Sequence, residues 1–185
     1  DDIGPAAAST NENVFIDIAG ANVTNLNITG ANDSFLVLEN SGASISAINI
    51  EGSGALSLIG ALPNSITTIN GGTSSTNFTV STGTVGATIT GGSGNDVIVL
   101  GGGNNNVNSG NGSDTITLST GNDTVNTGSG SDTVTASSGT NNITTGASDD
   151  QVTLTGGSNT VNSGASNDQL TISGGTNNID TESGN

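Results

Sequence analysis

The chain has 185 residues, with sixteen Asp and Glu but no Lys, Arg or His, giving a formal net charge of −16. A chain without cationic side chains has nothing to neutralise phosphates, which argues against nucleic-acid binding. Cys, Met, Trp and Tyr are also absent. Only carboxylates and hydroxyls remain for catalysis, and disulfide, zinc and haem sites lack their usual side chains. The length predicts one domain or two.

Apolar residues are sparse but evenly spaced along the chain. Leu, Ile, Val and Phe make up about a fifth of it, close to the roughly 20% level below which disorder is expected. Even spacing instead favours a repetitive extracellular β protein. No apolar run approaches the roughly 18 residues of a membrane span, so we expect no membrane insertion. The chain has neither an initiator Met nor a signal-like segment at its start, which predicts a mature product or a fragment.

The first predicted element in chain order is an irregular leader over residues 1–13. Residues 14–90 then carry a loose repeat of short apolar segments, with a period of about 19 to 22 that is typical of stacked coils. One series lies at 26–28, 48–50, 68–70 and 88–90, and a second at 35–38, 56–58, 78–80 and 98–100. We interpret residues 14–90 as wide β-solenoid coils that run without a linker into the regular repeats that follow.

Residues 91–185 carry a much stricter repeat. From Gly92 to Thr181, five 18-residue units follow one another without a gap. Four columns of each unit keep one residue type: Asp at position 5, an aliphatic residue at positions 7 and 16, and Gly at position 12. The columns are Asp96, Asp114, Asp132, Asp150 and Asp168; Ile98, Ile116, Val134, Val152 and Leu170; Gly103, Gly121, Gly139, Gly157 and Gly175; and Val107, Val125, Ile143, Val161 and Ile179.

Each 18-residue unit contains two three-residue strands separated by Gly/Asn/Ser turns. Such a strand cannot bury its single apolar residue alone, but coiling the chain stacks equivalent residues about 4.8 Å apart into a thin continuous core. A helix is excluded because the apolar period is not 3.6 and the helix breakers are too dense. The predicted fold class is all-β, a parallel β-solenoid (β-roll or β-helix) whose wide, irregular N-terminal coils lead into regular 18-residue coils.

Stacking also places the five Asp residues of position 5 in one file. Neighbouring carboxylates about 5 Å apart repel each other by about 1 kcal/mol in water, and more at lower effective dielectric. The chain has no Lys or Arg to relieve this repulsion. A Ca²⁺ ion held by six to eight oxygen atoms would relieve it, and Ca²⁺ tolerates irregular cages better than Mg²⁺ does. The alternative is that the file is a solvated acidic edge without metal.

Residues 91–99 read Gly-Gly-Ser-Gly-Asn-Asp-Val-Ile-Val and match the RTX nonapeptide G-G-x-G-x-D-x-U-x at every specified position. The C-terminal half therefore resembles an RTX β-roll, and the whole chain resembles bacterial S-layer and related RTX surface proteins. The resemblance implies Ca²⁺ between successive turns, held by Asp carboxylates and turn carbonyls. The implied ligands are Asp96, Asp114, Asp132, Asp150 and Asp168, with carbonyls near Gly92, Gly94, Gly110, Gly112, Gly128 and Gly130. The last two units depart from the motif, because Ser148 and Ser166 replace its later glycine.

The opposite half-turn departs further from the RTX pattern. Its equivalent column is Asn105, Asp123, Asn141, Asn159 and Asn177. Neutral Asn side chains can stack in hydrogen-bonded ladders without a cation. We therefore expect a metal-free seam on this edge and calcium on the other. Asp123 is the exception and is a candidate ligand.

Outward positions form files of Thr and Asn, such as Thr117, Thr135, Thr153 and Thr171. Flat Thr arrays resemble those of ice-binding solenoids, some of which are RTX repeats of bacterial adhesins. Thr and Asn are also the polar residues that stacked strands tolerate best, and we favour this plainer explanation. A glycan-cleaving solenoid would add basic or aromatic sugar-binding residues to paired carboxylates. The sequence has no basic and almost no aromatic residues, so we do not expect an enzyme.

The leading functional hypothesis is an extracellular structural protein, a calcium-stiffened β-solenoid that builds a bacterial surface layer or filament by self-assembly. The expected partners are other copies of the chain or the rest of a parent chain, joined end to end or in a lattice, and a cell-surface glycan is a further candidate. The alternative is the extender or ice-binding segment of a large RTX adhesin. Both hypotheses predict a secreted protein at the bacterial cell surface.

Overall fold

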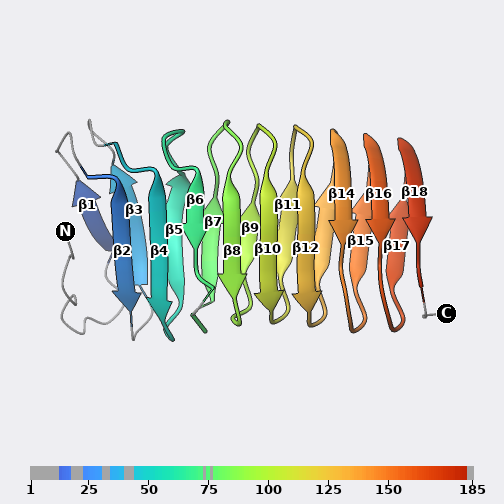
Figure 1. The fold of residues 1–185 in the computed structure, drawn as a ribbon, viewed down its shortest axis with the longest axis horizontal. Coiled ribbons are helices and arrows are strands. Elements are labelled where there is room, and N and C mark those ends of the chain that lie inside the picture. Colours follow the sequence, from blue (N-terminus) through green and yellow to red (C-terminus); the bar gives the residue numbers. More distant parts are fainter. Residues whose placement is uncertain are drawn as a thin grey trace.

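The computed structural model describes residues 13–17, 23–30, 34–39, 44–72, 74–75 and 77–182. Apart from Asn13, the predicted leader over residues 1–13 lies outside these residues. Eighteen strands form in the described part of the chain, and they alternate between two nine-stranded parallel sheets in chain order (Figure 1). The all-β solenoid prediction is confirmed. The described residues include no helix long and apolar enough to cross a membrane.

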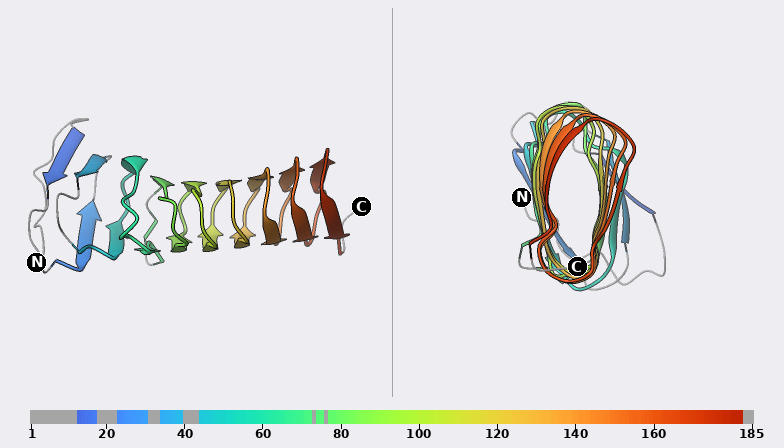
Figure 2. Two further views of the ribbon diagram at one scale, coloured as in Figure 1. Left: turned by 90° about the horizontal axis from the view of Figure 1, so that it is seen from above. Right: turned by 90° about the vertical axis from the view of Figure 1, so that its right-hand side faces the viewer.

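The odd-numbered strands form one sheet, and the even-numbered strands form the other. The odd sheet contains β1 (Asn13–Asp17), β3 (Ser34–Glu39), β5 (Leu56–Ala61), β7 (Phe78–Ser81), β9 (Val97–Val99), β11 (Thr115–Leu118), β13 (Thr133–Ala136), β15 (Gln151–Leu154) and β17 (Gln169–Ile172). The even sheet contains β2 (Asn25–Gly30), β4 (Ala47–Gly52), β6 (Thr68–Asn70), β8 (Thr88–Gly92), β10 (Asn106–Asn111), β12 (Thr124–Ser129), β14 (Thr140–Thr144), β16 (Ser158–Asn162) and β18 (Thr176–Asp180). Seen along its axis, the solenoid is a flattened oval with one sheet on each long side (Figure 2).

The coils become narrower toward the C-terminus. In the even sheet Leu26 pairs with Ile48, which pairs with Ile69, which pairs with Ile89, so each coil uses slightly less chain than the one before it. From the pairing of Ile89 with Val107 onward, the step is constant and equals the period of the sequence repeat. The odd sheet changes at an irregularity between Ser57 and Ala61, after which it follows the same period. The proposed domain limits at residues 13/14 and 90/91 stay a prediction.

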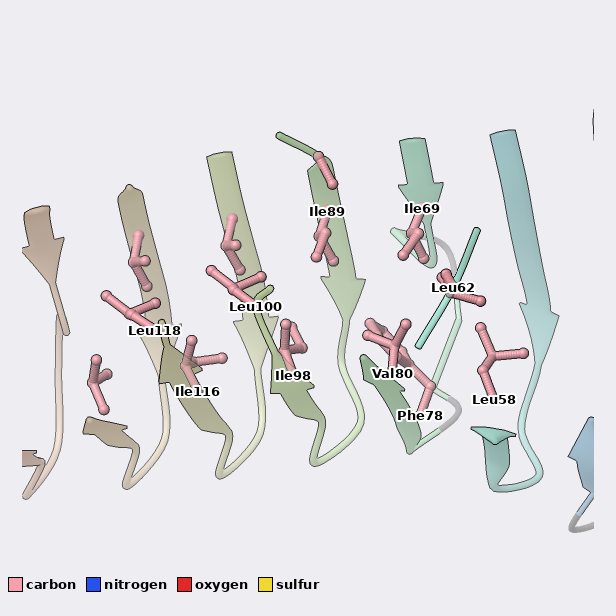
Figure 3. Close-up of a cluster of buried hydrophobic side chains, with 14 of the residues drawn as sticks. Leu58, Leu62, Ile69, Phe78, Val80, Ile89, Ile98, Leu100, Ile116 and Leu118 are labelled. Atoms are coloured by element: carbon pink, nitrogen blue, oxygen red, sulfur yellow. The ribbon is translucent and has the colours of Figure 1, made fainter. Parts of the chain in front are cut away.

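The core lies between the two sheets and follows the alternation of the strands. In β11 the side chains of Ile116 and Leu118 are buried, while Thr115 and Thr117 point outward. The wider coils fill their larger interior with Phe78, Leu58 and Leu62, and the narrow coils use Ile, Val, Leu and Ala (Figure 3). Burying one such large side chain contributes about 1.5–3 kcal/mol. A coil carries only a few of these residues, so each coil depends on its neighbours for stability.

The corners pack backbone against backbone. Gly130 has a φ of +123°, and a Cβ atom placed on it would lie 1.9 Å from the carbonyl oxygen of Gly112 in the preceding coil. Both the backbone conformation and the space therefore require glycine at this corner. The same close approach recurs where Gly128 meets the carbonyl oxygen of Gly110.

Two glycine substitutions separate the conformational effect from the packing effect. Gly60 also has a positive φ of +88°, but nothing lies within 4 Å of its Cβ position. We expect Gly60→Ala to cost about 1–2 kcal/mol of folding free energy, the cost of a left-handed residue. Gly130→Ala should cost at least about 2 kcal/mol more, because the Gly112 carbonyl must move. Urea denaturation in saturating calcium measures both values, and equal losses would contradict the close corner packing.

Candidate metal centre

The five Asp residues of the file lie at one edge of the solenoid, each directly before a strand of the odd sheet. Asp96 precedes β9, and the others precede β11, β13, β15 and β17. The first four side chains are only 1–2% exposed, and Asp168 in the last described coil is intermediate. The structure thus brings the predicted file together, but it turns the carboxylates inward. A solvated acidic edge does not have this burial.

One oxygen of each carboxylate is tied to the preceding coil. Asp114 Oδ1 accepts the backbone N–H of Asp96 at 2.7 Å, and Asp132 Oδ1 accepts that of Asp114 at 2.8 Å. The pattern continues at 2.8 Å and 3.0 Å through Asp150 and Asp168. At the start of the file, Asp96 Oδ1 accepts the N–H of Phe78 at 3.0 Å. Each carboxylate therefore fixes the register between two coils.

The second oxygen of each carboxylate has no hydrogen-bond partner. This is true of Oδ2 in all five members of the file, and each of these atoms is buried. An ionised carboxylate can only accept hydrogen bonds, and the chain has no Lys, Arg or His to pair with it. Burying an unpaired charge costs several kcal/mol. Either a proton or a cation must therefore satisfy each Oδ2 atom.

The electrostatics of the file reflect this environment. Burial raises the pKa of Asp96 to about 7 and that of Asp150 to about 6. The pKa values of Asp114 and Asp132 are also raised, again chiefly by burial, and the neighbouring Asp114 carboxylate adds to the shift at Asp132. The backbone N–H groups bonded to Oδ1 and the hydroxyl groups close to the carboxylates oppose these shifts. Without calcium, the ionised form of these buried carboxylates is therefore unfavourable, and a divalent cation would neutralise their charge.

Turn carbonyls lie close to the file. The carbonyl oxygens of Gly92 and Gly94 lie 2.1 Å and 2.2 Å from the Cβ positions of Gly110 and Gly112, and the Gly110 and Gly112 carbonyls approach Gly128 and Gly130 in the same way. These oxygens thus point toward the next coil. No three acidic side chains cluster among the described residues, so a cation at the file needs backbone or hydroxyl oxygens as well. The oxygen-only donor set fits Ca²⁺, and the individual ligand assignments stay predictions.

The corners of the last two units keep their shape despite losing glycine. Ser148 and Ser166 have φ values of +87° and +101°, in the same left-handed region as Gly112 and Gly130. Serine is strained there because its Cβ crowds the backbone. The carboxylates of Asp150 and Asp168 nevertheless make the same Oδ1 contacts as their equivalents upstream.

On the opposite edge, the Asn side chains form hydrogen bonds with one another and with turn carbonyls. Asn141 Nδ2 donates to Asn159 Oδ1 at 2.8 Å and to the Ser138 carbonyl at 2.9 Å, and Asn159 Nδ2 donates to Asn177 Oδ1 and to Gly156 in the same way. Asn105 Nδ2 likewise links the Gly103 carbonyl to the next coil. The amide nitrogen thus bridges a turn carbonyl and the next side chain, which is the linkage that a cation would have to supply on the Asp edge.

Asp123 interrupts this ladder. Its Oδ1 atom accepts from Asn105 Nδ2 at 2.8 Å, but its Oδ2 atom is buried without a partner. In the other coils of this column the atom in that position is an amide nitrogen that donates to a turn carbonyl. Asp123 therefore has a buried Oδ2 atom without a partner, as the members of the Asp file do, but it has no carboxylate neighbours in its own column.

The family comparison agrees with this geometry. The RTX calcium-binding nonapeptide repeat matches the chain in four copies, over residues 82–116, 108–143, 117–152 and 135–170. The comparisons with curated proteins and with solved structures found no match. The fold and the file define a parallel β-roll with stacked oxygen donors along one edge. Residues 82–170 thus match the RTX calcium-binding nonapeptide repeat, and the cation that such repeats bind is Ca²⁺.

Sequence reasoning overlooked a third column beside the file. Ser109, Thr127, Thr145 and Ser163 are 0% exposed, and their hydroxyl groups lie inside the solenoid. The signal was present, because these residues recur once in every repeat, directly before the first turn glycine. Ser and Thr are common throughout this chain, however, so a column of them does not stand out.

The raised pKa values predict how pH affects the calcium-free protein. Between pH about 4 and 7 the folded chain binds more protons than the unfolded chain, because Asp96 and Asp150 titrate near 7 and 6 when folded. Stability therefore falls as pH rises through this range and is greatest below it. Circular dichroism melts in calcium-depleted buffer should show a Tm that falls as the pH rises from 4 to 6, with little folded protein left by pH 7.5. A Tm that rises over this interval without calcium would contradict the buried file.

The two edges predict opposite effects for a matched pair of substitutions. Asp132→Asn supplies an Nδ2 donor where Oδ2 has no partner, so it should stabilise the calcium-free chain. It should also weaken the two calcium sites that flank it, because an amide brings no charge. Asn141→Asp should do the reverse, removing the bond to Asn159 and destabilising the chain by about 1–3 kcal/mol. Titration calorimetry measures the calcium sites, and calcium-free melts near pH 5, where the calcium-free chain is more stable, measure the change in stability. Equal behaviour of the two variants would show that the edges do not differ.

Proposed function

We propose that this protein is an extracellular structural element, a solenoid that folds and stiffens on Ca²⁺ and assembles with other copies into a bacterial surface layer or filament. The observation that carries the proposal is the row of buried, unpartnered Oδ2 atoms. Such a row makes a long, regular fold conditional on calcium, and calcium is abundant outside cells. RTX repeats are typical of secreted proteins, which supports the extracellular placement.

The distribution of charge supports self-association. Between residues 52 and 179 the chain has seven carboxylates, at positions 96, 114, 123, 132, 149, 150 and 168. Only Asp149 is exposed, Asp168 is intermediate, and the rest are buried. Apart from the exposed Val85, Val97 and Val99, the outer faces of these coils therefore consist mainly of Thr, Asn, Ser, Gln and Gly. Once calcium has neutralised the interior, little charge repulsion remains to keep two solenoids apart.

The last described coil offers a second contact surface. Ile172 is 46% exposed, and Leu170 and Ile179 are only partly buried, although their equivalents in earlier coils are buried. The outer edges of β17 and β18 pair with no further strand among the described residues. Exposed parallel strand edges above an apolar surface favour the stacking of another coil. That coil would come from a second copy or from continuing parent sequence.

The competing proposal is a segment of a large RTX adhesin, either an extender or an ice-binding element. The observation in its favour is the outward rank of Thr115 and Thr117, which pairs in register with Thr133 and Thr135 on the odd sheet. Gln151 and Gln169 interrupt the rank and hydrogen-bond to each other at 2.8 Å. We rank this proposal second because the flat Thr surface is short.

The test follows folding and association of the full chain as calcium is added. Circular dichroism should show little β structure in chelator at pH 7.5 and a full β spectrum in millimolar Ca²⁺. Light scattering and electron microscopy should then show ordered particles that grow with protein concentration. A complete β spectrum in chelator would overturn calcium-dependent folding. A strictly monomeric rod in calcium would overturn self-assembly and leave the adhesin proposal.

Two variants locate the contact if assembly occurs. Ile172→Glu places a charge on the exposed end coil, whereas Thr124→Glu places the same charge on the exposed outer face of β12. End-to-end stacking predicts that only Ile172→Glu blocks assembly, and lateral packing through the even sheet predicts that only Thr124→Glu does. Both variants should fold normally in calcium, since both sites are exposed.

A further inference from the structure

A column of buried hydroxyl groups runs alongside the Asp file. It consists of Ser109, Thr127, Thr145 and Ser163, which lie one sequence repeat apart and are 0% exposed. The RTX nonapeptide has glycine at this position, and the first coil keeps it as Gly91. This chain has therefore introduced an oxygen atom into the corner of the coil, in a place that the motif leaves without a side chain.

The first three hydroxyl groups donate their protons to the next coil. Ser109 Oγ donates to the carbonyl of Thr127 at 3.1 Å, Thr127 Oγ1 donates to that of Thr145 at 2.8 Å, and Thr145 Oγ1 donates to that of Ser163 at 2.9 Å. The Oγ atom of Ser163 is buried with no partner. A hydroxyl oxygen that donates in this way still has two lone pairs. Solvent does not reach these lone pairs.

The side chains of this column point toward the carboxylates. A Cβ atom placed on Gly91 would lie 2.3 Å from Asp96 Oδ2, which shows that a side chain here meets the second carboxylate oxygen. In the following coils the hydroxyls of Ser109, Thr127 and Thr145 interact with Asp114, Asp132 and Asp150 of the same corner. The Oγ atoms of this column and the buried Oδ2 atoms of the file thus lie together at one corner of each coil.

We propose that Ser109, Thr127, Thr145 and Ser163 provide calcium ligands, each through its hydroxyl oxygen and together with the Oδ2 atom of the Asp five residues later. In Ser109, Thr127 and Thr145 the hydroxyl proton stays in its hydrogen bond to the carbonyl of the next coil, so the oxygen can bind a cation while that hydrogen bond is kept. Ca²⁺ takes six to eight oxygens, and water normally fills the positions that protein leaves open. Each hydroxyl therefore replaces one bound water.

The proposal rests on the assignment of calcium to the Asp file, and it makes the coils unequal. The site of Asp96 lacks the hydroxyl because Gly91 precedes it, and no side chain fits there: the Cβ position lies 2.1 Å from the Ser109 carbonyl oxygen. The four later Asp residues of the file each have the hydroxyl beside them. A purely structural hydroxyl, serving only the hydrogen bond between coils, would change stability but not the number of waters on the metal.

The test counts water molecules on the bound metal. Tb³⁺ replaces calcium in the full chain, and its luminescence lifetimes in H₂O and D₂O report the bound waters. Thr127→Val removes the hydroxyl at almost constant volume, and Thr127→Ser keeps it. We expect Thr127→Val to add one water per chain and to weaken one calcium site about tenfold by titration calorimetry, while Thr127→Ser behaves as the wild type.

A second variant covers the case in which Thr127→Val does not fold. Ser109→Gly restores the glycine of the RTX motif, so folding should be retained, and it should also add one water. Thr135→Val, which removes a hydroxyl from the outer face of β13, should change nothing. Unchanged water number and affinity in Ser109→Gly would overturn the hydroxyl ligands. Absence of metal binding in the wild-type chain would instead overturn the calcium file itself.

Discussion

One buried carboxylate oxygen in each of the five 18-residue coils, left without a hydrogen-bond partner, is the constraint on which the rest of this structure depends. Oδ1 of each Asp in the file is satisfied by the backbone of the preceding coil, but Oδ2 is not. Hydrophobic burial cannot offset this alone, because each narrow coil contributes only a few aliphatic side chains. The fold is therefore encoded by glycine corners and stacked aliphatic residues, but its stability depends on a cation that the solvent supplies.

The two edges of the solenoid solve one geometrical problem in two ways. Each must join a turn carbonyl to a side-chain oxygen of the next coil. On the Asn edge the amide of Asn141 or Asn159 carries both donors within the chain. On the Asp edge a proton or a cation must supply this link, and neighbouring carboxylates repel each other until one of them binds. The coils are therefore joined along the Asn edge with or without calcium, whereas the link along the Asp edge depends on what binds there. Calcium thus changes the stability of the coil without changing its register.

Much of this arrangement could be predicted from the sequence. The 18-residue period alone fixes the stacking of Ile98 on Ile116 and the alignment of Asp96 with Asp114, and the nonapeptide points to calcium. The period of the repeat does not show whether the side chain of a corner residue faces the interior of the solenoid. The Asp side chains could have been solvated, and their burial follows from backbone turns at glycines with positive φ. The hydroxyl column was missed because Ser and Thr occur throughout, and what distinguishes Ser109 and Thr127 is complete burial, which composition does not record.

The charge of this protein is distributed in an unusual way. Most folded proteins keep carboxylates at the surface, where water and salt screen them. Here the repeat coils place theirs inside, and their outer faces are almost uncharged. In the unfolded chain the same carboxylates are exposed, and a net charge of −16 keeps chains apart. Under the proposed calcium-dependent folding, calcium binding withdraws charge from the surface in the same step in which it closes the coils. Folding and the loss of intermolecular repulsion would then be one event, and a calcium-loaded coil would have a regular, almost uncharged surface from the moment it forms.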